Sequence, residues 1–144
     1  MTEIRKDKTV SVKWAGKLTF IGKGGNGESV TMDAGAENGG LGLGHSPMDL
    51  LLIGAGGCAS IDIVMILKKS RQNISDVEVE VFGERAEEMP KKYTKIHMHF
   101  VVRGADLKDA HVERAVKLSM EKYCSASATL EAGCEMTFDW EVVE

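Results

Sequence analysis

Three cysteines, Cys58, Cys124 and Cys134, give this chain its clearest potential for chemistry. Their number is odd, and the sequence has neither a Cys-x-x-Cys pair nor a Cys/His spacing typical of metal ligands. A disulfide framework and a zinc site are therefore not predicted. A cysteine outside such sites is either a reactive thiol or a small buried apolar residue. Both interpretations remain open for Cys58 and Cys124 from their spacing alone.

Cys58 lies within an apolar segment, residues 46–71, that we expect to form one long helix. Ser46 is a typical N-cap, Pro47 suits the first helical position, and Asp49 can complete a capping box. Basic residues at the far end match the negative end of the helix dipole. Because nearly every face is apolar, this helix should be buried all round.

The residues just before Cys58 include three glycines, Gly54, Gly56 and Gly57. A glycine in a helix interior costs about 0.5–1 kcal/mol relative to alanine, so three of them indicate that something approaches the backbone closely. Acidic residues (Asp49 and Asp62) interrupt the segment, and the uninterrupted part is too short to span a bilayer. We therefore expect a chemical role near Cys58 and no membrane role.

Cys124 lies where two helices are predicted to meet. Apolar residues at helical spacing predict a helix over residues 106–123, and residues 125–132 predict a short separate helix that Gly133 stops. Cys124 would then lie at a helix N-terminus, where the dipole favours a thiolate.

Alternating apolar and polar residues predict several strands around these helices. They fall at residues 10–14, 18–20, 29–33, 77–81, 94–102 and 136–142. This order predicts an α+β chain with an antiparallel sheet. The 144 residues, 43% of them apolar, suit a single domain covering residues 1–144, with polar residues 1–8 frayed.

Two other sequence patterns resemble binding sites, but neither predicts one. Residues 22–27 (GKGGNG) match a dinucleotide fingerprint, but a strand-like segment follows them, and Asn26-Gly27 is a favoured hairpin turn. We expect a hairpin and no cofactor. His97 and His99 share one strand face without a third ligand nearby, so a solvated face is expected there, not a metal site.

The charge distribution narrows the range of partners. The formal net charge is −4, with acids and bases interspersed, which gives little support for nucleic acid or an anionic membrane as a partner. Residues 1–10 lack the apolar core of a signal peptide, so a cytoplasmic location is expected.

Residues 46–58 (SPMDLLLIGAGGC), together with Tyr123-Cys124-Ser125 and a closing aromatic strand, resemble the OsmC/Ohr superfamily. Residues 85–97 and 106–109 resemble its YhfA-like branch, and the resemblance covers residues 10–143. It implies an OsmC-like fold, with antiparallel sheets wrapped around a long central helix that carries a cysteine. It also implies a swapped, intertwined homodimer.

The same resemblance implies a thiol-dependent peroxidase of oxidative-stress defence that reduces organic hydroperoxides. Cys58 matches the peroxidatic cysteine and Cys124 the resolving cysteine, and a dithiol would serve as reductant. Cys134 matches no position of the family and is interpreted as structural. The competing hypothesis is a non-catalytic dimer of the same fold that binds a small hydrophobic ligand or senses redox state.

One part of the family pattern is missing. Active family members pair an arginine of the N-terminal hairpin with a glutamate directly after the proline, whereas residues 10–45 contain no arginine and Met48 follows Pro47. The lysines present lack the planar guanidinium fork. Asp49 and Arg85 are candidate replacements for the acid and the cation. Arg85 is equally well explained as an ordinary exposed charge.

Overall fold

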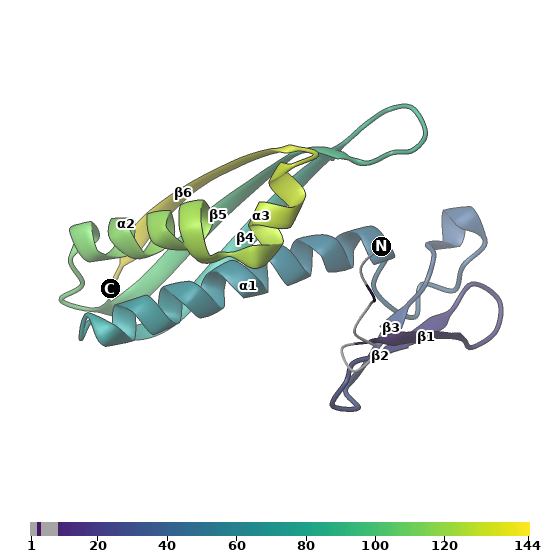
Figure 1. Cartoon of the computed structure of the whole chain (residues 1–144), viewed down its shortest axis with the longest axis horizontal. Helices are drawn as coiled ribbons and strands as arrows, with labels where there is room; N and C mark the ends of the chain where they lie inside the picture. The colour runs from purple at the N-terminus through teal and green to yellow at the C-terminus, as the bar shows by residue number, and fades with distance from the viewer. Residues whose placement is uncertain (1–2, 4–8) are drawn as a thin grey trace. The chain divides into compact units, whose positions relative to one another are not determined.

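The computed structural model describes Glu3 and residues 9–144 (Figure 1). Apart from Glu3, the segment predicted to be frayed (residues 1–8) lies outside the described residues. The chain forms two compact units, residues 1–51 and 52–144, and the boundary falls inside helix α1 (Pro47–Lys69).

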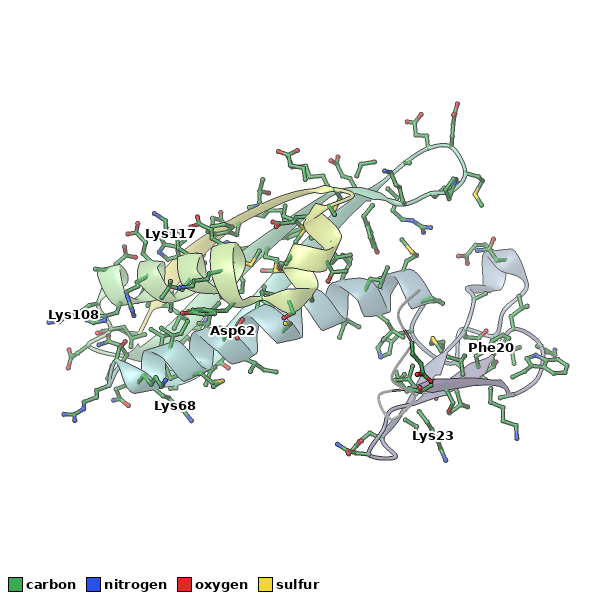
Figure 2. The ribbon with its side chains drawn as sticks, viewed as in Figure 1. Phe20, Lys23, Asp62, Lys68, Lys108 and Lys117 are labelled. Carbon is green, nitrogen blue, oxygen red and sulfur yellow. The ribbon has the colours of Figure 1, made fainter. Side chains whose placement is uncertain are left out.

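The first unit contains a three-stranded antiparallel sheet in the order β1-β2-β3. Its strands are β1 (Ser11–Trp14), β2 (Phe20–Lys23) and β3 (Ser29–Met32), and Figure 2 labels the two ends of β2. Gly27, at φ 91°, closes the turn between β2 and β3 by donating its N–H to the Gly24 carbonyl at 3.1 Å. The predicted hairpin is confirmed, and a strand follows the glycines where a dinucleotide site would need a helix.

A glycine-rich loop with one 3-10 turn, η2 (Ala36–Asn38), connects β3 to α1 and is anchored by Asp33. The Asp33 carboxylate accepts hydrogen bonds from Thr19 Oγ1 at 2.9 Å and from the backbone N–H groups of Ala34, Leu41 and Leu43 at 2.8, 3.4 and 3.2 Å. Burial raises the pKa of Asp33, but these hydrogen bonds outweigh it and lower the pKa below its ordinary value. One carboxylate therefore holds both ends of the loop.

The second unit contains the strands β4 (Asn73–Arg85), β5 (Tyr93–Ala105) and β6 (Glu135–Val143), in the order β4-β5-β6. β4 and β5 are antiparallel, as predicted, but β6 runs parallel to β5. The prediction of a purely antiparallel sheet is wrong at this strand. The helices between β5 and β6 form a crossover, which carries the chain back to the end where β5 began.

The core of this unit lies between the sheet and the helices (Figure 1). α1 buries Ala55, Ala59, Ile63 and Leu67, each at most 1% exposed, so one face of the helix is packed. The opposite face leaves Ile61 63% exposed. The prediction of burial on every face is therefore wrong for the single chain, because the sheet covers α1 from one side.

α1 is also long and apolar enough to cross a membrane by length and composition. The interruption by two acids does not exclude this, contrary to the expectation from the sequence. The core helices of soluble proteins pass the same test, so the finding is weak evidence for a membrane.

The remaining helices are α2 (Asp109–Leu118), a π-helical turn η3 (Ser119–Tyr123), and α3 (Ser125–Glu131). The Cys124 N–H donates to the Ser119 carbonyl at 2.7 Å, which closes the wide turn. The predicted break between two helices at Cys124 is confirmed.

Candidate functional site

The structure brings Cys58 and Cys124 together from α1 and from the start of α3. Cys124 Sγ lies 3.9 Å from the carbonyl oxygen of Ala55, which precedes Cys58 by one turn of α1. Cys58 also lies near enough to influence the Cys124 thiol, and its presence raises the pKa of Cys124. Both cysteines are free thiols, so the site contains two reduced sulfurs on neighbouring elements.

Cys124 occupies the predicted N-cap position of α3, but its electrostatics differ from the prediction. The thiol is 3% exposed, and this burial raises the pKa of Cys124 above its ordinary value. Ser127 opposes the shift, and its backbone N–H donates to Cys124 Sγ at 3.4 Å, whereas Cys58 adds to it. Because burial dominates, the predicted preference for a thiolate is wrong, and Cys124 remains a protonated thiol at neutral pH.

The two thiols differ in accessibility. Cys58 is partly exposed and packs at the margin of the core, whereas Cys124 belongs to the core. A small molecule from solvent can therefore reach Cys58 more readily than Cys124.

Of the three glycines before Cys58, one lies against β4 and the other two face open space. A Cβ added at Gly56 would lie 2.9 Å from Val81 Cγ2 and 3.2 Å from Val79 Cγ1, so β4 makes the close approach predicted from the sequence. An added Cβ at Gly54 or Gly57 would meet nothing within 4 Å. The packing of β4 thus fixes α1 directly beside Cys58.

Ser119, which the sequence analysis did not select, fixes the second wall of the site. Its hydroxyl donates to the Ala59 carbonyl of α1 at 3.0 Å and lies 3.3 Å from Asp62 Oδ2. These contacts tie η3, and with it Cys124, to the turn of α1 that carries Cys58. In the sequence, Ser119 falls within the apolar stripe of the predicted helix. A serine at such a position needs a hydrogen-bond partner once it is buried, and this could have indicated its role.

Asp49 lies in the first turn of α1, nine residues before Cys58, and is exposed. Its backbone N–H donates to Ser46 Oγ at 3.0 Å, which confirms the predicted N-cap. Asp49 belongs to the first unit and the cysteines to the second, so a role for its carboxylate at the site stays a prediction.

Arg85 is the last residue of β4, and its Nε donates to the Lys91 carbonyl at 2.8 Å in the β4–β5 connection. A Cβ added at Gly83 would lie 3.3 Å from Leu52 Cδ1, so β4 approaches the start of α1 as it reaches Arg85. The strand therefore leads away from Cys58 at this end. A role for Arg85 in activating the thiol also stays a prediction.

The two histidines of β5 have partners on β6. His97 Nδ1 lies 2.7 Å from Thr137 Oγ1, His99 Nδ1 lies 2.7 Å from Asp139 Oδ1, and His99 Nε2 lies 3.0 Å from Glu141 Oε2. Within the described residues, no group of three or more His, Cys, Asp or Glu side chains is arranged to hold a metal ion. The histidines instead join two parallel strands.

Comparison with known proteins agrees with this fold. The family model described as OsmC-like protein matches residues 38–139. Protein YhfA of Escherichia coli K12 is 47% identical over 132 residues, covering 92% of this chain and 96% of YhfA. The crystal structure of a hypothetical protein from Aquifex aeolicus VF5 has 34% identity and a TM-score of 0.84, and the match covers 99% of each chain.

The chain therefore belongs to the OsmC-like family, and the predicted family and α+β, OsmC-like fold are confirmed. The organic hydroperoxide resistance protein OhrB of Bacillus subtilis has 17% identity and a TM-score of 0.62, covering 93% of this chain and 97% of OhrB. At that identity the likeness shows the fold alone.

Proposed function

We propose that this protein is a thiol-dependent peroxidase that reduces organic hydroperoxides, with Cys58 as the peroxidatic and Cys124 as the resolving cysteine. The observation that supports it best is that two free thiols of unequal exposure lie on elements packed against each other. The accessible thiol suits the reaction with a peroxide from solvent. The buried thiol lies beside the turn of α1 that carries Cys58, which suits the second step.

In the first step, the Cys58 thiolate attacks the distal oxygen of the hydroperoxide, ROOH. The O–O bond breaks, an alkoxide leaves and takes up a proton to become the alcohol ROH, and Cys58 becomes a sulfenic acid. The peroxide is reduced by two electrons and the sulfur is oxidised by two. Because Cys124 remains protonated, it does not compete as the nucleophile.

In the second step, Cys124 attacks the Cys58 sulfenic acid, an S–S bond forms, and water leaves. A dithiol reductant then reopens the disulfide by exchange and becomes a disulfide itself. The sum is ROOH plus a dithiol giving ROH, water and the oxidised dithiol. Because Cys124 packs against the turn of α1 that carries Cys58, the disulfide can close rapidly and protect Cys58 from further oxidation.

The proposal also includes a cation that favours the Cys58 thiolate. Arg85 and Asp49 are its candidates for the activating cation and the acid that orients it. Both are exposed, and Arg85 already binds the Lys91 carbonyl. We expect R85Q to slow the first step more than the second if Arg85 acts on Cys58.

A homodimer in the cytoplasm completes the proposal. The uncovered face of α1 carries exposed Ile53 and Ile61 beside Gly54 and Gly57, which leave room for a second backbone. A second copy of the chain would bury this apolar face, as the family resemblance implies. The reducing cytoplasm would keep the two thiols free between turnovers.

The experiment is a single turnover of fully reduced protein with one equivalent of cumene hydroperoxide, followed by mass spectrometry. The proposal predicts the loss of two hydrogens and a peptide cross-link between Cys58 and Cys124. C134S is the matched control, because Cys134 has no role in the proposed reaction. Its Sγ lies 3.3 Å from the Leu130 carbonyl oxygen, and its removal should not change the product. An intact dithiol after exposure to the peroxide would contradict the proposal and favour a non-catalytic binding protein.

A further inference from the structure

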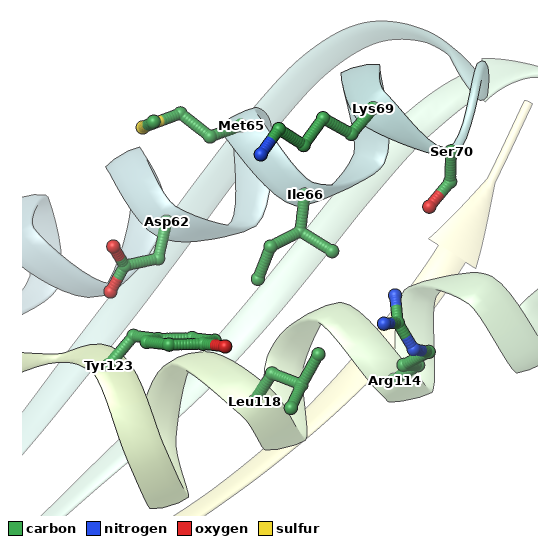
Figure 3. Close-up of a pocket in the computed structure, with 8 residues that line it drawn as sticks. All are labelled: Asp62, Met65, Ile66, Lys69, Ser70, Arg114, Leu118 and Tyr123. Atoms are coloured by element: carbon green, nitrogen blue, oxygen red, sulfur yellow. The ribbon is translucent and has the colours of Figure 1, made fainter.

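A groove of about 670 Å³ lies between the second half of α1 and the α2–η3 helix (Figure 3). Its volume falls within the range of about 300–1,000 Å³ that is typical of small-molecule sites. Ile66 of α1 and Leu118 of α2 face each other across its middle (Figure 3). The groove therefore has an apolar centre of a size that suits an organic ligand.

Two pairs of polar side chains lie at the two ends of the groove, and the Lys69 amine points toward Met65 between them (Figure 3). Arg114 and Ser70 lie at one end, and Asp62 and Tyr123 lie at the other (Figure 3). Asp62 already has a partner, because the Ser119 hydroxyl lies 3.3 Å from its Oδ2. A ligand bound along the groove would thus have one end beside a guanidinium and the other beside a phenol.

The charged side chains of the groove are mostly positive. Neither Lys69 nor Arg114 forms an ion pair with any residue that the structure describes. On the same helix, Lys117 pairs with Glu113 at 2.7 Å. With one carboxylate, Asp62, against two cations, the lining carries a net charge of about +1 and attracts an anion.

We infer that this groove binds a small carboxylic acid with an apolar body. The carboxylate binds the Arg114 guanidinium, whose planar fork matches it, and Lys69 adds positive charge to the lining as a whole. The apolar body packs on Ile66 and Leu118. A single negative charge matches the net charge of the lining better than a doubly charged phosphate does. The site uses neither cysteine and is independent of the proposed peroxidase activity.

The test uses 4-phenylbutyrate as probe and uncharged 4-phenylbutanamide as its matched neutral analogue, titrated into full-length protein with ¹³C-labelled Ile and Leu methyl groups. The methyl resonances of Ile66 and Leu118 should shift with the acid, and the amide should bind at least about tenfold more weakly because it lacks the charge. R114Q should weaken binding of the acid by a similar factor. K117Q is the control on the same helix and should bind like the wild type.

Three results would each overturn the inference: equal affinity for acid and amide, no loss of affinity in R114Q relative to K117Q, or unshifted Ile66 and Leu118 resonances at saturation. C58S separates this site from the proposed peroxidase. It should bind 4-phenylbutyrate like the wild type, whether or not the wild type reduces peroxides. Loss of binding in C58S would also contradict the assignment of an independent site.

Discussion

Gly56→Ala tests the packing that fixes α1 beside the cysteine pair. The new Cβ would lie 2.9 Å from Val81 Cγ2, closer than real Cβ contacts, and 3.2 Å from Val79 Cγ1, which is tighter than most of them. The substitution gains about 0.5–1 kcal/mol of helix propensity. Overpacking costs about 1–3 kcal/mol, because the valine methyl groups belong to a strand and cannot move aside freely. We expect a net destabilisation of about 1 kcal/mol.

The assay is urea unfolding followed by circular dichroism, at equal protomer concentrations and at several dilutions. For a chain of this size, the same change should lower Tm by about 4 °C. The loss in G56A should not depend on concentration, because the contact with β4 lies within one chain. Gly57→Ala is the matched control, since an added Cβ there meets nothing within the chain.

G57A should gain about 0.5–1 kcal/mol in the protomer. Any loss that it shows should vary with dilution, because it would arise at the proposed contact between two copies. A G56A protein as stable as G57A at every concentration would refute the reasoning, since β4 would then not pack against this turn of α1.

Three further predictions concern single polar groups. Ser60 Oγ is buried without a hydrogen-bond partner among the described residues, so S60A should leave the free energy of unfolding unchanged or raise it by about 1 kcal/mol; a clear loss would reveal a partner. Hydrogen bonds to Asp139 raise the pKa of His99, and hydrogen bonds to His99 lower the pKa of Asp139. The stabilisation from His99 is complete below its ordinary pKa of 6.5 and is lost as the pH rises through the raised value. The stabilisation from Asp139 is complete above its ordinary pKa of 3.8 and is lost as the pH falls through its lowered pKa. The difference in Tm between wild type and D139N should therefore be largest between these two ordinary values, and a difference that does not vary with pH would contradict the assignment. Finally, D33A should remove hydrogen-exchange protection from the Leu41 and Leu43 amides, whereas D76N, which changes an exposed carboxylate in the other unit, should not. Retained protection in D33A would show that another group holds the loop.

Local signals in the sequence predicted the local features correctly. The Ser46 cap, the hairpin at Gly27 and the helix break at Cys124 each depend on a few neighbouring residues. These features follow from short-range hydrogen bonding and backbone preference, which a single sequence displays directly. The positions of Cys58 and Cys124 on their elements could therefore be predicted.

The features that the sequence did not predict depend on contacts between distant segments. Alternation shows that residues 135–143 form a strand but not its direction, so the parallel pairing of β6 was missed. The partners of His99 lie on that strand, more than forty positions away in one case. The raised pKa of Cys124 depends on how deeply tertiary packing buries it, which outweighs its position at a helix start.

The most direct test of the central proposal is steady-state reduction of cumene hydroperoxide with a dithiol reductant, either dithiothreitol or a lipoyl dithiol, by wild type, C58S, C124S and C134S. The account predicts turnover by wild type and C134S and none by C58S. C124S should lose catalysis with the dithiol and accumulate a sulfenic acid at Cys58. Wild-type turnover no faster than the buffer control with either reductant, or undiminished turnover by C58S, would contradict it.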